Sequence, residues 1–426
     1  MTYPIPDDVN TMIPYQQALE LVLSQVSTLE AEEVPLVESV GRVAAADLCS
    51  DVDISPFDHA AMDGFAMKAS SLASACADNP VQLKVIAEVP AGSVYEGPIA
   101  ADECVRIMTG APLPAEADAV VKYEIVDYLK GDGREGSVVA FTKPAEAHEN
   151  VRNKGEEIAA GQVAIHRHEV ITAAGVGFLA SCGIATVPVF RRPKVGVISI
   201  GSELIDITCK PEAGTIRDGN SHALCACVAQ AGGTFHRYPT VPDDLQALTD
   251  VVLAATEECD FVLTSGGASN GDYDFIKPVV EANGTLLMTL VNMRPGKAQT
   301  FGIVNGTPVF GLPGNPAAAY CGFEILARQA LRKMQGFTNF QRPQVKARMA
   351  SFRKKKDPRV IFLRATLQRR DDGDLWVTPA KNQSSGLFGT MQQANCLAIM
   401  PAGTNPVEEG AWVDCVLLHV EEGTVL

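Results

Sequence analysis

The feature that most constrains the fold is a regular alternation of short apolar runs and helical stretches between residues 195 and 336. The run Val195–Ile200 has the composition of a strand that is buried on both faces. Strands that alternate with helices specify a doubly wound, mostly parallel sheet that helices cover on both sides. We expect strands at Val195–Ile200, Thr234–Tyr238, Phe261–Thr264, Leu286–Val291 and Thr307–Leu312, and helices at Asn220–Ala231, after Pro242, at Asp274–Ala282 and at Pro316–Gln335.

The rest of the chain has other patterns, and a length of 426 residues indicates several domains. Apolar residues at helical spacing predict an amphipathic helix over Pro14–Val26. From Val81 to about Lys143, short runs of β-branched residues separated by turn residues predict a small all-β unit. Helical character returns between Arg167 and Gly183. After Gly336, short strands predict a C-terminal β-barrel or sandwich.

Composition excludes several classes of protein. Lys and Arg number 35 against 51 Asp and Glu, so the net charge of −16 argues against a nucleic-acid footprint or an anionic membrane surface. No apolar run is long enough to span a membrane, and the N-terminus does not resemble a signal peptide, so we expect a cytoplasmic protein. The 11 cysteines are scattered and we expect reduced thiols; Cys225 and Cys227 are a poor metal pair because positions i and i+2 point to different sides of a helix.

Three loops after predicted strands have the composition of a binding site. In open α/β sheets, ligands bind beyond the carboxyl ends of the strands. The loops are Ile200–Leu204, Thr264–Asp274, and Leu312–Pro316 at a helix N-terminus, whose N–H groups can meet an anion. The middle loop is neither a P-loop nor a dinucleotide fingerprint, because it lacks both glycine patterns.

Charged residues accompany these loops. Arg294 and Lys297 follow another strand, and Arg152 and Lys154 precede a glycine; in an acidic chain they suggest an anion site. The run Arg353–Lys356 is instead expected to be a solvated loop. Carboxylates beside phosphate-type ligands usually hold Mg²⁺, although Asp243 could simply cap its helix. The candidate carboxylates are Asp63, Glu203, Asp243, Asp244 and Asp274.

Seven motifs in order resemble the molybdopterin molybdenumtransferase family, which includes MoeA and the gephyrin E-domain. The resemblance covers nearly the whole chain. The motifs are Pro56–Ala66, Arg106–Pro112, Gly155–Ile158, Gly201–Leu204, Ser265–Asp274, Arg294–Lys297 and Gly311–Pro316.

The resemblance implies a four-domain homodimer. The domains would be an N-terminal helical and linker domain (1–60 and 148–192), an inserted β domain (61–147), the α/β molybdopterin-binding domain (193–337) and a C-terminal β-barrel (338–426). The active site would lie between the α/β domain of one subunit and the region around Asp63 of the other.

The resemblance also implies a reaction, in which adenylylated molybdopterin and molybdate are converted with Mg²⁺ into molybdenum cofactor and AMP. Molybdopterin adenylyltransferase and apo-molybdoenzymes are the expected partners. Asp63, Glu203, Asp243, Asp244 and Asp274 would be catalytic, and Glu203, Asp243 and Asp274 would bind the metal. The substrate-binding residues would be Thr109, Arg152, Ser265, Gly266, Gly267, Ser269, Arg294, Lys297, Pro313, Gly314, Asn315 and Pro316.

The chain departs from the usual family pattern at Glu157, Ser202, Ala298 and His59-Ala60. Misplacement of a reacting group by about 1 Å can cost roughly 10²-fold in rate, so a divergent paralogue that binds molybdopterin as a scaffold is one alternative. Adenylyl transfer to molybdopterin is another, but the loop Gly266–Ser269 differs from the one typical of that chemistry. Tungstate could replace molybdate, since the two oxyanions have similar size.

Overall fold

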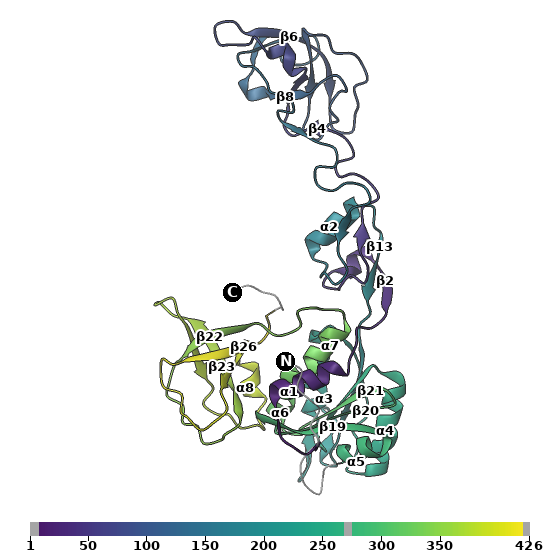
Figure 1. The fold of residues 1–426 in the computed structure, drawn as a ribbon, viewed down its shortest axis with the longest axis vertical. Coiled ribbons are helices and arrows are strands. Elements are labelled where there is room, and N and C mark those ends of the chain that lie inside the picture. The colour runs from purple at the N-terminus through teal and green to yellow at the C-terminus, as the bar shows by residue number, and fades with distance from the viewer. Residues whose placement is uncertain (1–7, 268–274, 421–426) are drawn as a thin grey trace. The chain divides into compact units, whose positions relative to one another are not determined.

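A computed structural model of the chain describes residues 8–267 and 275–420. The chain forms two compact units, Met1–Glu32 with Val189–Leu426, and Glu33–Pro188 (Figure 1). No helix in the described ranges is long and apolar enough to cross a membrane. The division into four domains with the bounds given above remains a prediction.

The first unit contains the expected α/β sheet, in the strand order β17-β14-β18-β21-β20-β19. The pairings of β17 with β14, β14 with β18, and β18 with β21 are parallel. The strands are β14 (Lys194–Ser199), β17 (Thr234–Arg237), β18 (Phe261–Ser265), β19 (Gly284–Arg294), β20 (Ala298–Val304) and β21 (Thr307–Leu312). The helices are α3 (Gly219–Gln230), α4 (Leu245–Glu258), α5 (Ile276–Asn283), α6 (Pro316–Gly322) and α7 (Arg328–Met334).

Strand β20 was not predicted, and it makes part of the sheet antiparallel. It pairs antiparallel with both β19 and β21. Only Pro295, Gly296 and Lys297 connect β19 to β20, and so short a connection allows an antiparallel pair but not a parallel crossover. The apolar pattern of β20 is interrupted by Gln299 and Gly302, which explains why the sequence did not reveal it.

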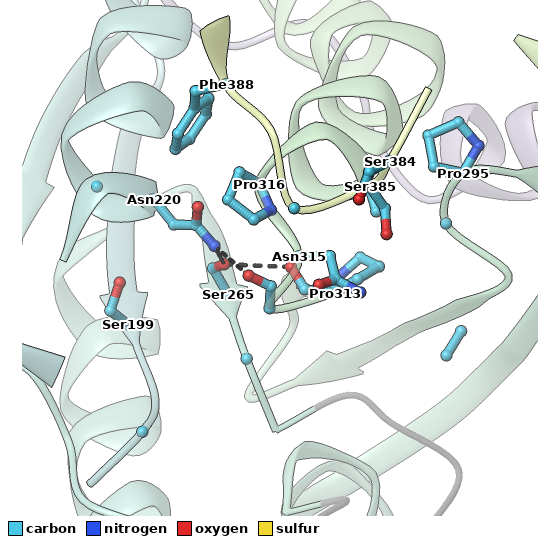
Figure 2. Close-up of a pocket in the computed structure, with 18 of the residues that line it drawn as sticks. Ser199, Asn220, Ser265, Pro295, Pro313, Asn315, Pro316, Ser384, Ser385 and Phe388 are labelled. Atoms are coloured by element: carbon cyan, nitrogen blue, oxygen red, sulfur yellow. Dashed lines mark hydrogen bonds between the residues drawn. The ribbon is translucent and has the colours of Figure 1, made fainter. Parts of the chain in front are cut away.

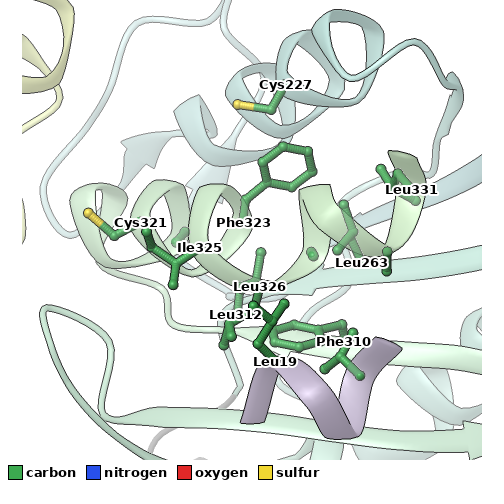
Figure 3. Close-up of a cluster of buried hydrophobic side chains, with 14 of the residues drawn as sticks. Leu19, Cys227, Leu263, Phe310, Leu312, Cys321, Phe323, Ile325, Leu326 and Leu331 are labelled. Atoms are coloured by element: carbon green, nitrogen blue, oxygen red, sulfur yellow. The ribbon is translucent and has the colours of Figure 1, made fainter. Parts of the chain in front are cut away.

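Alternate residues of the parallel strands contribute to cores on opposite faces of the sheet. Leu263 and Phe310 belong to a cluster that includes residues of α3 and α6, whereas Val262 and Val309 pack with residues of α4 and α5. This period of two is what a strand buried on both faces requires. Figure 3 shows the first cluster, where Leu326 and Leu331 lie over the strand side chains.

The N-terminal helix and the long helix after β21 complete this core. Helix α1 (Tyr15–Ser24) buries Ala18, Leu19 and Val22, which belong to its predicted apolar stripe, and also Leu21, which does not. The single helix predicted over Pro316–Gln335 is divided by a π-helical turn, η4 (Phe323–Ala327), between α6 and α7. It ends as expected before Gly336, whose φ of 83° is one that glycine adopts readily.

The C-terminal part of the first unit is a closed barrel. Its strands are β22 (Gln344–Met349), β23 (Val360–Arg369), β24 (Leu375–Pro379), β25 (Cys396–Met400) and β26 (Trp412–Leu417), in the order β23-β24-β22-β26-β25, and β25 pairs back to β23. The end of β19 pairs with the start of β23, with Arg294 opposite Ile361. This pairing places the barrel beside the carboxyl end of β19. Short elements of this unit are β1 (Ile13–Pro14), β15 (Leu204–Ile205), β16 (Ile216–Arg217) and α8 (Gly389–Gln392).

The second unit is built around a sheet in the order β8-β5-β7-β6-β10-β9, which confirms the predicted all-β stretch. Its strands are β5 (Gly64–Met67), β6 (Val81–Val89), β7 (Glu103–Ile107), β8 (Ala119–Lys122), β9 (Asp127–Lys130) and β10 (Val138–Phe141). Helix α2 (Ala173–Ser181) is capped by the Thr172 hydroxyl, which accepts a hydrogen bond from the Gly175 N–H. The remaining elements are β3 (Leu48–Cys49), β4 (His59–Ala60), β11 (Val151–Arg152), β12 (Val163–Ile165), η1 (Leu36–Ser39), η2 (Ala69–Leu72) and η3 (Tyr123–Ile125). Strands β2 (Ala31–Pro35) and β13 (Thr186–Phe190) include the points at which the chain passes between the two units.

Candidate active site

A cavity of about 1400 Å³ opens where the carboxyl ends of β14, β18 and β21 meet in the first unit. This is the edge of an open α/β sheet at which ligands are expected to bind. The predicted site residues that line it are Glu203, Asp243, Ser265, Gly266, Gly267, Arg294, Lys297, Pro313, Gly314, Asn315 and Pro316. The structure therefore brings together residues that are more than 100 positions apart in the sequence.

The glycine turn after β18 requires glycine at its first position. Gly266 has a φ of +90°, and a Cβ placed there would lie less than 3.0 Å from the carbonyl oxygen of Ile200. Gly267 has a φ of +62°, and its nearest neighbour would be the end of the Ile200 side chain, at 3.1 Å. The Gly267 carbonyl accepts hydrogen bonds from the N–H groups of Phe275 and Ile276, at 2.9 and 3.2 Å. Ser269 and Asp274, predicted for this loop, lie outside the described residues.

Asn220, which was not predicted, joins two of the loops. Its Nδ2 donates to the Ser265 hydroxyl and to the Gly314 carbonyl oxygen, both at 2.8 Å (Figure 2). The Ser265 hydroxyl in turn donates to the Pro313 carbonyl oxygen at 3.3 Å. The only feature of the sequence that marks Asn220 is its position in the first turn of a helix. That position does not predict hydrogen bonds to Ser265 and Gly314.

Beneath Asn220, a buried carboxylate fixes the start of α3. Asp218 is 3% exposed and caps the helix by accepting from the Ser221 N–H at 3.0 Å. It also accepts from the hydroxyls of Ser221 at 2.6 Å and Ser199 at 2.9 Å. Since a buried carboxylate is stable only with such donors, this network anchors α3 to the end of β14.

The adjacent carboxylates Asp243 and Asp244 have different environments. Asp243 lines the cavity, and its Oδ2 accepts from the Ser202 N–H at 3.0 Å while its own N–H donates to the Ser202 hydroxyl at 3.0 Å. Asp244 caps α4 by accepting from the Ala247 N–H at 2.8 Å. The suggestion that Asp243 caps this helix was therefore wrong. Asp244, predicted to be catalytic, is not among the described residues that line the cavity.

The described carboxylates do not by themselves form a complete metal site. Glu203 and Asp243 both line the cavity, but no three His, Cys, Asp or Glu side chains within 8–267 and 275–420 converge on a common point. Asp274, the third predicted ligand, lies outside these ranges. Cys225 and Cys227 are buried, and burial raises the pKa of Cys225 to about 11, which favours a protonated thiol over a metal ligand.

Positive charge reaches the cavity from β19 and from the barrel. Arg294 Nη1 contacts Asp357 Oδ2 at 3.1 Å, and Arg359 Nη2 contacts the same oxygen at 2.5 Å. The hydrogen bonds from Arg359, assisted by Arg294, hold the pKa of the Asp357 carboxyl far below its usual range. Lys297 is exposed, and no described group forms a hydrogen bond or ion pair with its ammonium. It is therefore available to an anionic ligand.

The expectation that Arg353–Lys356 is a solvated loop is wrong for Lys355. The side chain is 5% exposed, and its ammonium donates to the backbone carbonyl oxygens of Asp357 at 2.6 Å, Arg359 at 2.7 Å, and Gly403. Backbone carbonyls thus replace water around this charge. The lysine holds the loop that carries Asp357 and Arg359.

One wall of the cavity comes from the barrel and was not predicted. Ser384, Ser385 and Phe388 line it, and Figure 2 shows them facing the loops of the α/β sheet. The Ser385 carbonyl oxygen accepts from the Ala317 N–H, at the start of α6, at 2.8 Å. The sequence around these serines resembles an ordinary turn, so only the three-dimensional structure identifies them.

The remaining predicted residues lie in the second unit. Asp63 Oδ1 accepts from both the N–H and the hydroxyl of Thr109, each at 2.7 Å, and these bonds lower the pKa of the Asp63 carboxyl. Arg152 Nη1 contacts Glu156 Oε1 at 2.7 Å. The pairing of Asp63 with Thr109 joins two of the sequence motifs at one point of this unit.

Three family models match this chain in order. They describe the MoeA N-terminal region (residues 13–183), a probable molybdopterin binding domain (196–333) and the MoeA C-terminal region (346–418). These matches define the class of the protein, a MoeA-type chain whose α/β sheet lies in the region matched by the probable molybdopterin binding domain and whose barrel lies in the region matched by the MoeA C-terminal region.

Comparison with individual relatives identifies the family. The molybdopterin molybdenumtransferase of Staphylococcus aureus (strain MSSA476) is 34% identical over 95% of each chain, and that of Bacillus subtilis (strain 168) is 34% identical over 97% of this chain and 96% of its own. Two solved structures of the moeA protein from Pyrococcus horikoshii align with TM-scores of 0.83 and 0.81, at 32% and 30% identity over 96% of this chain and 99% and 100% of theirs. The chain belongs to the molybdopterin molybdenumtransferase family, and it is a transferase of molybdenum cofactor biosynthesis.

Proposed function

We propose that this protein inserts molybdenum by converting adenylylated molybdopterin and molybdate, with Mg²⁺, into molybdenum cofactor and AMP. The observation that carries the proposal is the cavity at the strand ends of this family member. A glycine turn and a helix N-terminus meet there with cations that include Arg294 and Lys297 and carboxylates that include Glu203 and Asp243. Both substrates are anions, and such a site supplies positive charge before they arrive. The first N–H groups of α6 are not free donors, because Ala317 donates to the Ser385 carbonyl oxygen and Ala318 and Ala319 donate to that of Asn315.

The carboxylates that line the cavity fit Mg²⁺. This ion keeps several water ligands and needs only one or two carboxylates, which Glu203 and Asp243 provide. Asp274 is the proposed third ligand. When bound, Mg²⁺ would neutralise charge that develops on the phosphoanhydride.

The chain's own residues orient the substrates and attract their charge. Asn220 and Ser265 hold the loop at Gly314 in place, so that the N-terminus of α6 faces the cavity. Arg294 and Lys297 draw anions toward the same space. The Pro313 and Pro316 rings restrict the loop between them and favour a fixed shape.

The direct test is incubation with adenylylated molybdopterin, molybdate and Mg²⁺, followed by measurement of AMP and reconstitution of an apo-molybdoenzyme. Asp274→Asn is expected to slow AMP release at least about tenfold, or roughly 1.4 kcal/mol in the barrier. Asp244→Asn is the matched control, since asparagine caps helices as well as aspartate does. Pterin binding without AMP release by the wild type would indicate a scaffold instead, and parallel assays with tungstate would test oxyanion preference.

We further propose a homodimer in which Asp63 of one subunit completes the site of the other. Mixed Asp63→Asn and Asp274→Asn subunits would then form heterodimers with one intact site out of two. Random exchange across a two-fold interface gives up to about a quarter of wild-type activity per subunit. Activity that stays at the level of the separate mutants, despite verified subunit exchange, would reject the shared site.

A further inference from the structure

We infer that Arg364 is a positioning residue, which holds the barrel segment Asn382–Gly386 against the cavity and so sets the affinity of the site for its oxyanion. The inference rests on the proposed function for the identity of that ligand. Arg364 itself is not among the residues that line the cavity. It acts through Ser384 and Ser385, which are.

The hydrogen bonds of Arg364 surround this segment. Its Nη2 donates to the carbonyl oxygens of Asn382 at 3.3 Å and Ser384 at 2.9 Å. Its backbone N–H donates to Gln383 Oε1 at 3.1 Å, and its carbonyl oxygen accepts from Gln383 Nε2 at 2.9 Å. One residue thus binds three successive residues of the segment, by side chain and backbone together.

The far side of the segment is bound to helix α6. The Ser385 carbonyl oxygen accepts from the N–H of Ala317, in the first turn of α6. Ser384 and Ser385 are therefore held between Arg364 on strand β23 and the helix that forms the opposite wall. A shift on the Arg364 side would move both hydroxyls relative to the glycine turn.

The burial of Arg364 argues against a role in stability alone. The side chain is 0% exposed, and Phe362, which shares its face of the strand, lies in the main apolar core. Its Nε and Nη1 have no hydrogen-bond partner within the described residues. Burying a charge with two unsatisfied donors costs folding free energy, and an apolar side chain of similar size would be less destabilising at this position. The hydrogen bonds from the guanidinium to the carbonyl oxygens of Asn382 and Ser384 account for an arginine at this buried position.

The experiment measures binding of molybdate alone by equilibrium dialysis, using the full-length protein. Arg364→Lys keeps the charge but loses the planar fork, and we expect its Kd to rise at least about fivefold. In a Ser384→Ala/Ser385→Ala background the same change should raise Kd by less than about twofold, because the groups it positions are gone. Arg369→Met is the control, since this exposed side chain on the same strand donates to the Gly373 carbonyl oxygen, outside the cavity.

Each result decides the inference. An unchanged Kd for Arg364→Lys, equal losses in both backgrounds, or no molybdate binding by the wild type would overturn it. Thermal unfolding shows whether Arg364→Lys folds. If Arg364→Lys does not fold, the same binding measurement is made on Arg364→Met, which removes the buried charge. AMP release by the wild type tests the proposed function separately, so a protein that binds molybdate without turnover would reject the function but not the positioning role.

Discussion

The two adjacent carboxylates at the start of α4 offer a test in which function and stability should separate. Asp244→Ala removes the helix cap, which costs roughly 1 kcal/mol. For a unit of this size that cost corresponds to a fall in Tm of about 2–4 °C. Because Asp244 does not line the cavity, we expect kcat/KM for AMP release to stay within about twofold of wild type. Asp244→Asn should restore the Tm.

Asp243→Asn should show the opposite pattern. It preserves the size of the side chain and one oxygen for the Ser202 N–H, but removes the charge that faces the cavity. We expect kcat/KM to fall at least about tenfold, or roughly 1.4 kcal/mol, with little change in Tm. Both quantities are measured on the same preparations, by circular dichroism and by steady-state AMP release. A loss of turnover in Asp244→Ala as large as that in Asp243→Asn would refute this division of roles.

Three further outcomes are expected. Gly266→Ala should lower the free energy of unfolding by more than about 3 kcal/mol, since its Cβ would strike backbone, whereas Gly267→Ala should cost less than about 2 kcal/mol; equal losses in urea titrations would contradict the geometry. Lys297→Ala should weaken pterin phosphate binding, and the loss measured by calorimetry should shrink at high salt because charge attraction is screened; a salt-independent loss would indicate packing. Thr109→Val should raise the pKa of Asp63 toward its usual value of about 3.9, as followed by NMR; the stabilisation from this pair is present above that usual value and is lost as pH falls through the lowered pKa.

The parallel strands of the α/β sheet and the loops that follow them were predictable because both depend on local sequence pattern. Buried strands such as Phe261–Ser265 are apolar throughout, and the loops after them carry glycine and proline where the turn needs them. The rule that ligands bind beyond the strand ends then places these loops around one cavity. No long-range information was needed for this step.

The barrel wall of the cavity was not predictable, because it depends on pairing between distant segments. Ser384 and Ser385 reach the site only because β23 pairs with the end of β19, across more than 60 residues of sequence. The residues of β19 and β23 do not indicate which strand each will pair with. The antiparallel strand β20 lies between β21 and β19 in the sheet order. It was not predicted because its apolar pattern is short and interrupted.

The charge of a lysine or arginine does not by itself predict that its side chain is exposed to solvent, as Lys355 and Arg364 show. Lys355 stands in a run of four basic residues that was expected to be solvated, and Arg364 lies in strand β23. In the structure each donates to backbone carbonyl oxygens of an irregular loop, which take the place of water. Loops that lack regular hydrogen bonds leave carbonyls to be satisfied, and a long basic side chain can reach several at once. The basic residues near the cavity therefore differ in their contacts, since Lys355 and Arg364 donate to loop carbonyl oxygens whereas Arg294 and Lys297 line the cavity.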